Sequence, residues 1–258
     1  MLETVAWYQS VDPAGAVVQL NAVADQSVRV SGADIYCPPL THCILLAGGA
    51  DATVAPYMRF ASPSQRRKTT TYIDPLNTAT AAAVKPVSPH GVVDLRGNPI
   101  PLVSGEQLNI ELNSNPAAAQ IQWGVAWLAD GPVKPIQGPM FTVRATGTAT
   151  LTPGTWSNVP LTFTEDLPRG RYQVVGMGAI SVGCIAARVV FIGGQYRPGV
   201  LGQGTIATIP SPIFRNGGLG IFGEFEDTDQ PTVDFLSVSA DTVEEVYFDL
   251  IQVRDGAA

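Results

Sequence analysis

The chain has 258 residues and a formal net charge of −7 at pH 7, and only 14% of its residues are charged. This acidic balance excludes a protein that mainly coats nucleic acid, because such proteins present a basic face. Charged side chains are those that stay in water, and a soluble domain usually has about 25% of them. We therefore expect other subunits or partners to cover much of the surface.

The chain begins with MLETVAWYQSVDPAG, which has neither the basic nor the apolar region of a secretory signal. We therefore expect synthesis in the cytoplasm without a signal peptide. No apolar run approaches the roughly 20 residues that span a membrane as a helix. The three cysteines are an odd number without framework spacing, which favours reduced, buried thiols.

Short runs rich in Val, Ile, Thr and Phe recur along the chain, and each is bounded by Gly, Pro, Asn or Asp. Examples are Ser27–Tyr36, His42–Gly49, Gln107–Asn113 and Arg171–Ser181. In Gln107–Asn113 every second residue is apolar, which predicts a strand with one buried face. The 26 glycines and 21 prolines are spread between these runs, as turns would be. We predict an all-β protein.

One helix is predicted among the strands, at residues 74–84. Asp74 is placed as its N-cap, Pro75 occupies the first helical position, and Pro86 follows as a stop. The alanine-rich stretch between them favours helix formation.

The only basic run precedes this helix, in a predicted loop that contains Arg66, Arg67 and Lys68. Intersubunit salt bridges or plain solvation are the first interpretation of these side chains. Contact with the phosphates of an enclosed genome is the alternative, because such contacts depend on Arg and Lys.

Cys37, His42 and Cys43 are close in sequence, which raises the question of a zinc site or a thiol nucleophile. Structural zinc takes four ligands, usually as two closely spaced pairs, and no second pair exists. Adjacent residues on a strand point to opposite faces, so His42 cannot activate Cys43 directly. We predict buried or half-buried strand residues here.

Two further stretches resemble binding motifs. Gly176–Gly183 begins like a dinucleotide fingerprint, but Ser181 stands where the third glycine belongs, and no βαβ pattern surrounds it. Asp227 and Asp229 lie in the densest acidic stretch and are weak candidates for sharing a calcium ion. A solvated loop is the default interpretation of that stretch, since no EF-hand pattern continues from it.

Trp123 and Trp127 lie four residues apart on a predicted strand, so they share one face. Packing in a core or an interface is the preferred interpretation. A platform on which sugars stack is the functional alternative.

Two segments of equal length share one outline, Ala117–Gly131 and Thr242–Gly256, and both end in Asp-Gly. At an offset of 125 residues the apolar positions coincide: Ile121, Trp123, Val125 and Leu128 fall on Val246, Phe248, Leu250 and Val253. A cap-like residue, Asn115 or Asp241, and an alternating strand precede each segment.

A second pair of segments lies upstream, Pro39–Arg59 and Pro168–Arg188, at an offset of 129 residues. Identical residues coincide at Pro39 and Pro168, Gly49 and Gly178, Ala50 and Ala179, and Arg59 and Arg188. The two matches occur in the same order with nearly equal offsets, which indicates a structural repeat. Its period is too long for solenoid units and is about one β-sandwich. We predict two similar sandwiches, residues 1–131 and 132–258.

Two sandwiches of this size in one chain, with a helix late in the first, resemble the double jelly-roll major capsid proteins of tailless icosahedral phages and the enlarged adenovirus hexon. The resemblance covers the whole chain as a pattern of duplication, strand density, length and helix placement, and it includes no diagnostic motif. It implies two tandem jelly rolls, homotrimeric capsomers, self-assembly into an icosahedral shell, and location in the virion. The implied partners are further copies, other virion proteins, and weakly a genome or an internal membrane.

Two other functions use the same architecture. A tandem carbohydrate-binding, adhesin-like or spike-like module would need clustered aromatic residues or a metal-binding loop. An enzyme on a β-sandwich, such as a glycosidase or a lyase, has only the acidic stretch in its favour. We predict a structural protein that is not an enzyme, without a cofactor, a catalytic residue or a dedicated small-molecule substrate.

Overall fold

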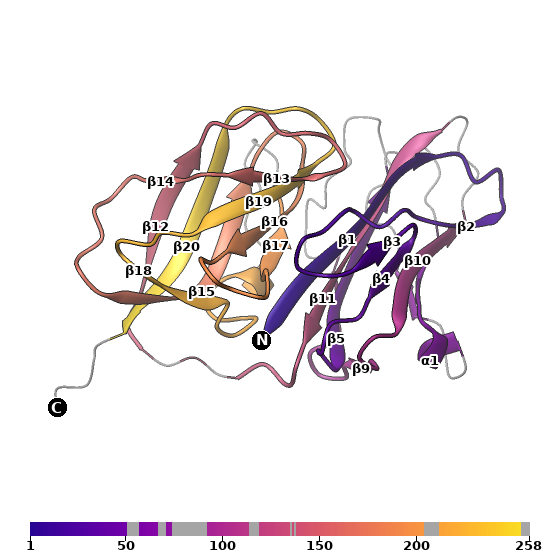
Figure 1. The fold of residues 1–258 in the computed structure, drawn as a ribbon, viewed down its shortest axis with the longest axis horizontal. Coiled ribbons are helices and arrows are strands. Elements are labelled where there is room, and N and C mark those ends of the chain that lie inside the picture. The colour runs from indigo at the N-terminus through magenta and orange to yellow at the C-terminus, as the bar shows by residue number, and fades with distance from the viewer. Residues whose placement is uncertain are drawn as a thin grey trace. The chain divides into compact units, whose positions relative to one another are not determined.

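The computed structural model of the chain describes residues 1–50, 57–66, 71–73, 92–113, 119–134, 136, 138–203 and 212–253. Within these residues the chain is all-β, and its antiparallel strands form four sheets (Figure 1). It divides into two compact units. The first comprises Leu2–Pro132 with Gly154–Trp156, and the second comprises Val133–Pro153 and Ser157–Ala258 with Met1.

The first unit consists of two sheets. One sheet has the order β1 (Leu2–Val11), β11 (Gln120–Ala129), β5 (His42–Ala50) and β8 (Val92–Asp94), with β9 (Ile100–Pro101) also paired to β5. The other has the order β3 (Val30–Ser31), β4 (Asp34–Tyr36), β10 (Gln107–Asn113), β6 (Tyr57–Ala61) and β7 (Thr71–Ile73), with β2 (Val17–Gln19) also paired to β10.

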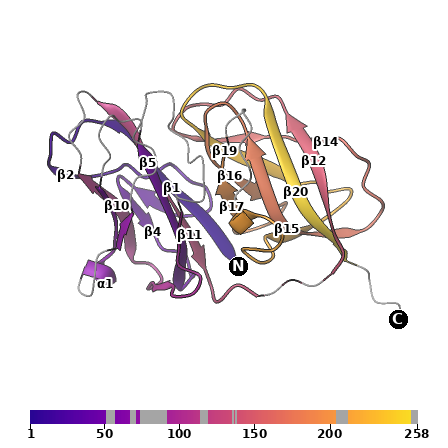
Figure 2. The ribbon, with the colours of Figure 1, turned by 180° about the vertical axis from the view of Figure 1, so that it is seen from behind.

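The second unit also consists of two sheets. One has the order β14 (Thr162–Phe163), β12 (Met140–Gly147), β20 (Glu244–Val253), β15 (Arg171–Ile180) and β18 (Gly223–Glu226). The other has the order β13 (Trp156–Val159), β19 (Thr232–Ser237), β16 (Cys184–Val190) and β17 (Gly199–Leu201). The long strand β20 runs between β12 and β15 in both views (Figure 1, Figure 2).

The described strands of the two units follow one connectivity. Certain described strands of each unit have a counterpart in the other unit, and these are called the common strands. Counted along the chain, the first common strand pairs with the last, the last with the third, and the third with the sixth. These are β1, β11, β5 and β8 in the first unit and β12, β20, β15 and β18 in the second. The remaining common strands pair in the order second, seventh, fourth and fifth: β2, β10, β6 and β7, and then β13, β19, β16 and β17. Two packed sheets with this connectivity form a jelly roll, so each unit is a jelly-roll sandwich.

The repeated sequence segments lie on equivalent strands. Ala117–Gly131 contains β11 and Thr242–Gly256 contains β20, which are the last strands of their units. Pro39–Arg59 contains β5 and the start of β6, and Pro168–Arg188 contains β15 and most of β16. The sequence repeat therefore reflects a repeat of strand order and strand pairing.

The strands differ in how many of their faces are buried. Most residues of β5 and β11 are apolar in an unbroken run, and the described part of each strand is buried along both faces from Cys43 and Gln122 onwards. In β12 apolar and polar residues alternate, and Val143 and Ala145 are buried on either side of the exposed Arg144. Such alternation is typical of a strand with one face on the core and one in water.

The core of the first unit depends on two close approaches to glycine. A side chain at Gly124 on β11 would bring its Cβ within 2.2 Å of Ile110 Cδ1 on β10, so this position faces the opposite sheet of the sandwich. At Gly49 on β5 a Cβ would lie 2.6 Å from the indole ring of Trp123, its cross-strand neighbour. Glycine within a strand often marks such a close approach.

Aromatic rings fill the core of the second unit. Tyr172 and Phe225 stack with ring centroids 5.7 Å apart, and Phe163 stacks on Phe248 at 5.8 Å. Aromatic pairs at these separations stabilise a core beyond the area that they bury.

The helix expected at residues 74–84 lies outside the described residues. Two short helical segments that the sequence did not suggest are present, α1 (Pro63–Arg66) and the 3₁₀ turn η2 (Pro212–Phe214). The cap-like residue Asp241 precedes a strand, and its carboxylate closes turns instead of capping a helix. No helix in the described part of the chain is long and apolar enough to cross a membrane.

Candidate functional site

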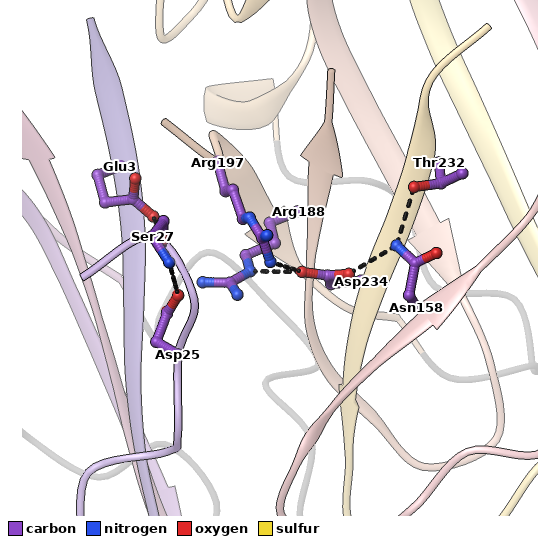
Figure 3. Close-up of polar contacts among 8 residues, drawn as sticks. All are labelled: Glu3, Asp25, Ser27, Asn158, Arg188, Arg197, Thr232 and Asp234. Atoms are coloured by element: carbon purple, nitrogen blue, oxygen red, sulfur yellow. Dashed lines mark hydrogen bonds and ion pairs between the residues drawn. The ribbon is translucent and has the colours of Figure 1, made fainter. Parts of the chain in front are cut away.

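Arg188 on β16 and Asp234 on β19 lie opposite each other in the register of the two strands. Arg188 Nε donates a hydrogen bond to Asp234 Oδ2 over 3.1 Å, and Arg197 Nη1 donates to the same oxygen over 2.7 Å. Both guanidinium groups converge on this carboxylate in Figure 3. The side chains of Arg188 and Asp234 are 1% and 4% exposed, so the ion pair is buried, where charge-assisted hydrogen bonds are strong.

The other oxygen of Asp234 is bound from the neighbouring strand β13. Asn158 Nδ2 donates to Asp234 Oδ1 over 2.8 Å and lies 2.8 Å from Thr232 Oγ1 (Figure 3). A carboxylate remains ionised in an interior only when its oxygens have donors, and both oxygens of Asp234 have them. The cluster ties β13, β19 and β16 together through side chains as well as through the strand ladder.

The first unit has an ion pair at the equivalent place. Arg59 on β6 lies opposite Glu111 on β10, and its guanidinium group forms a salt bridge with Glu111 Oε2. Glu111 is 7% exposed, but Arg59 is 35% exposed, so this pair lies nearer to water than its counterpart. In both jelly rolls an arginine on the fourth common strand thus pairs with an acid on the seventh.

A separate polar cluster of the first unit holds the segment before β3 against β1. Glu3 is fully buried, and Ser27 Oγ lies 3.1 Å from Glu3 Oε1 and 2.7 Å from Asp25 Oδ1 (Figure 3). The backbone N–H of Ser27 also donates to Asp25 Oδ1 over 2.7 Å. This local bond is typical of a turn built on an aspartate.

On the second unit, Asp249 of β20 fixes the segment that follows η2. Arg215 donates to both carboxylate oxygens, over 2.8 Å and 2.6 Å, and the backbone of Asn216 and the hydroxyl of Thr142 donate over 2.9 Å and 2.8 Å. Burial alone would raise the pKa of the fully buried Asp249, but these hydrogen bonds hold it below its ordinary value. Asn216 has a φ of 53°, a left-handed conformation that asparagine tolerates better than most residues.

Another charged pair lies on the same sheet, nearer to water. Arg144 on β12 pairs with Glu245 on β20, and the hydroxyl of Tyr247 donates to Glu245 Oε2 over 3.0 Å. The bond from Arg144 lowers the pKa of Glu245, and Tyr247 adds to that effect against a smaller opposing effect of burial. Because the Arg144 side chain is 43% exposed, we expect this pair to contribute little to stability.

Three loops meet at one end of the second jelly roll, and Asp241 connects them. Its Oδ2 accepts hydrogen bonds from Ser181 Oγ and the Val182 N–H, both over 2.7 Å, and its backbone carbonyl accepts from the Leu151 N–H over 3.0 Å. Residues 148–153, 181–183 and 238–243 are called the loop end below. Two exposed apolar side chains, Val182 and Val243, lie on it.

Most of the exposed large apolar side chains among the described residues belong to the second unit. Its described members, here called the apolar surface set, are Met1 (65% exposed), Met140 (41%), Phe141 (39%), Val182 (49%), Ile192 (74%), Ile221 (46%) and Val243 (60%). The first unit has Val17 (55%) and Val103 (59%). Exposed apolar side chains on fixed strands and turns are suited to contact with protein.

No protein-family model matches the sequence, and no curated protein matches it. Among solved structures the chain is similar to the STIV major capsid protein, with 9% identity and a TM-score of 0.25 over 98% of this chain and 97% of that one. It is also similar to a Paenibacillus xanthan lyase, with 11% identity and a TM-score of 0.20 over 98% of this chain and 25% of the lyase chain.

The candidate calcium ligands lie in a turn that closes on the protein. Asp227 follows β18, its Oδ1 accepts the Gly170 N–H over 2.9 Å, and its own N–H donates to the Gly170 carbonyl over 3.0 Å. Asp229 is exposed, and its N–H donates to the Glu226 carbonyl over 2.9 Å. The carboxylate of Asp227 is thus occupied in holding the turn. Among the described residues no three His, Cys, Asp or Glu side chains are grouped as metal ligands would be.

The basic run is only partly described. The backbone of Arg66 ends α1, and Arg67 and Lys68 lie outside the described residues. The structure therefore adds nothing to the prediction that these three residues contact a subunit or nucleic acid.

The cysteines are buried, as predicted. Burial raises the pKa of Cys37 to about 12, with a smaller contribution from Glu106, and burial also raises the pKa of Cys43. The Cys43 thiol lies 3.4 Å from the Leu45 carbonyl, and His42 Nδ1 lies 2.9 Å from the hydroxyl of Thr41. Neutral buried thiols are inert, whereas a nucleophile or a zinc ligand is a thiolate.

The tryptophans and the glycine-rich stretch belong to the fold. Trp123 and Trp127 on β11 are fully buried, so their rings offer no platform for a sugar, and the prediction of packing is confirmed. Gly176–Gly183 spans the end of β15, the turn 181–183 and no helix. At Gly176 a Cβ would lie 2.5 Å from Asp249 Oδ2 and 2.9 Å from the backbone N of Asn216. The absence of a side chain at this position therefore leaves room for the segment that contains Arg215.

Sequence reasoning missed the buried acids. Of these residues only Arg188 is marked in the sequence, because it matches Arg59 in the repeat. Asp234 and Asp249 lie in largely apolar strands, where the spacing of a carboxylate does not indicate a site. Arg215 follows residues 204–211, which the structure does not describe, and no pattern in the sequence connects it with β20.

Proposed function

We propose that the chain is a viral major capsid protein, with a structural and not a catalytic role in the virion. The observation that carries the proposal is the repetition of one jelly-roll connectivity in two units of a single chain, with an arginine–acid pair at the same strand pair in each. Three such chains supply six similar sandwiches, and this allows a nearly hexagonal tile to be built from three copies.

The surface chemistry supports a role in assembly. Only 14% of the residues are charged, and the apolar surface set lies mainly on strands and turns of the second unit, including the 181–183 turn that Asp241 holds. Burying apolar area contributes about 25 cal/mol per Å², less the cost of ordering and of rigid-body association. Rigid elements reduce that ordering cost.

The finer proposal is a phage capsid protein that forms homotrimers and closes into an icosahedral shell with other virion proteins. Its contacts with a genome or an internal membrane are weak, because the chain is acidic. The alternative of a sugar-binding module has lost its main support, since the tryptophans proposed as a platform are buried.

The test is the oligomeric state of the purified chain, measured by native mass spectrometry and light scattering at micromolar concentration. We expect a trimer or a larger assembly built from trimers. A monomer at every concentration tested would contradict the proposal.

Variants then locate the contact surface. Ile192→Asp and Val243→Asp place a charge in the apolar surface set and should shift the trimer towards monomer with an unchanged circular dichroism spectrum. Val103→Asp, at an equally exposed valine of the first unit, is the matched control and should leave the trimer intact. If the control alone dissociates the trimer, the contact surface lies on the first unit and this assignment of the surface is wrong.

A further inference from the structure

Glu244 is a buried acid in the second unit that takes part in no ion pair among the described residues. It begins β20 opposite Gly147 of β12, so both residues point to the same face of the sheet. A side chain at Gly147 would meet Val159, which places Glu244 on the face directed into the sandwich. Its exposure is 0%, although it lies only one residue from the exposed Val243.

The hydrogen bonding of Glu244 is incomplete. Apart from a weak contribution of its own backbone N–H, the carboxylate accepts one hydrogen bond, at Oε2, from the Ala149 N–H over 3.2 Å, and its Oε1 has no hydrogen-bond partner among the described residues. A buried carboxylate with so few donors is costly when ionised and much less so when protonated.

The charges around Glu244 make ionisation less favourable still. From residues 238–243 it faces Asp241, whose own carboxylate has hydrogen bonds from Ser181, Val182 and Thr242. The segments 148–153 and 181–183 contain no charged residue. On β20 and β12 the nearest charges are Glu245 and Arg144, which pair with each other on the opposite face of the sheet.

We propose that Glu244 is a proton-operated latch of the loop end, which holds residues 148–153 and 181–183 closed when it is protonated and loosens them when it is ionised. In the closed state Ala149 and Leu151 are both bound to the 241–244 stretch, one through Glu244 and one through the Asp241 carbonyl. Ionisation places a second negative charge beside Asp241 without a counterion, and opening of the loops admits water to it. The latch stands whether or not the chain forms capsomers.

The pKa values of Glu244 and Asp241 are shifted in opposite directions. Burial raises the pKa of Glu244 above its ordinary 4.5, and the charge of Asp241 adds to this, whereas the hydrogen bonds from the N–H groups of Ala149 and of Glu244 itself oppose it. Burial would also raise the pKa of Asp241, but its hydrogen bonds lower it below its ordinary 3.8. A raised carboxyl pKa means that the closed state binds more protons than the open state, so closure weakens as pH rises from 4.5 through the raised value.

Amide hydrogen exchange of the full chain tests the latch, with exchange times scaled for the intrinsic effect of pH. We expect protection of peptides covering 148–153 and 181–183 to fall by up to about tenfold per pH unit above the ordinary pKa, until Glu244 is fully ionised. In Glu244→Gln, which keeps the shape and removes the charge, protection should be high and should not depend on pH. Glu245→Gln removes the adjacent acid on the other face and should keep the wild-type dependence.

Protection that is independent of pH in the wild type, or a dependence that survives in Glu244→Gln, would overturn the proposal. A second measurement needs no variant: carbon-13 NMR titration of the side-chain carboxyl groups in the wild type. Glu244 should titrate above 4.5 and Asp241 below 3.8, and a Glu244 midpoint at or below 4.5 would refute the latch on its own.

Discussion

Arg188 and Asp234 face each other across β16 and β19, and Arg59 and Glu111 occupy the equivalent positions across β6 and β10. The two pairs differ in their distance from water. Arg188 is 1% exposed, whereas Arg59 is 35% exposed. One position of the repeated fold thus carries a buried ion pair in the second jelly roll and a partly solvated one in the first.

Replacing Arg188 with Gln should destabilise the second unit by about 3–5 kcal/mol, because loss of one partner leaves a buried charge incompletely paired. Because Arg197 and Asn158 still bind Asp234, we expect the loss at the lower end of that range. Urea unfolding followed by circular dichroism measures the change in the free energy of unfolding.

Arg59→Gln is the matched variant in the first unit and should cost only about 1 kcal/mol or less, since its guanidinium group already reaches solvent. Equal losses of unfolding free energy in Arg188→Gln and Arg59→Gln would show that the difference in exposure does not make the two ion pairs differ in their contribution to stability.

The repeat made much of the fold predictable, because apolar periodicity and turn residues are local signals. The matched segments fall on the third, fourth and last common strands of the two units, and the match of Arg59 with Arg188 marks equivalent side chains. The sequence suggested a boundary between residues 131 and 132, and the two compact units divide next to it, at Pro132 and Val133.

The side-chain clusters could not be predicted in the same way, because they join residues that are distant in sequence. Asp249 and Arg215 are 34 residues apart, and Arg188 and Asp234 are 46 apart. Nothing near Glu244 in the sequence indicates that its carboxylate is buried while that of Glu245 pairs with Arg144, since only the alternation of the strand separates them. The close spacing of Asp227 and Asp229 suggested a shared calcium ion, yet the carboxylate of Asp227 accepts a backbone hydrogen bond within a turn.

Asp249→Asn should free the segment that follows η2 and lower stability by about 2–3 kcal/mol at neutral pH, because hydrogen bonds to a buried carboxylate are lost. The pKa of Asp249 is below its ordinary 3.8, so its stabilising effect is fully present above that value and is lost as pH falls through the lowered pKa. Thermal unfolding from about pH 3 to about pH 7 should show this acid-side loss in the wild type and a smaller one in the variant.

Glu224→Gln is the control for Asp249→Asn on the same sheet. Its partner Arg171 is 45% exposed and Glu224 is 39% exposed, so little change is expected. If Asp249→Asn is as mild as this control, Asp249 does not hold the segment.

Gly49→Ala tests the contact of Trp123 with β5. The added Cβ would lie 2.6 Å from the ring, which is fully buried and has little room to move, and we expect a loss of about 1–3 kcal/mol. Gly97→Ala, where nothing lies within 4 Å of the new Cβ, should change stability by no more than about 0.5 kcal/mol. The tryptophan fluorescence spectrum should shift in the first variant alone, and a silent Gly49→Ala would mean that the ring does not rest on β5.

The three cysteines should resist thiol reagents in the folded chain. With a pKa of about 12, roughly one Cys37 thiol in 10⁴ is ionised at pH 8, and burial blocks the reagent as well. Cys37, Cys43 and Cys184 should therefore react slowly with Ellman's reagent in buffer and completely in denaturant, because in the native chain reaction requires unfolding of the surrounding strands. Cys37 and Cys43 lie in the first unit and Cys184 lies in the second, so the three rates also report which jelly roll opens first. In Arg188→Gln the reaction of Cys184, on the same strand β16, should accelerate while that of Cys43 is unchanged; acceleration of both would show that the units unfold together.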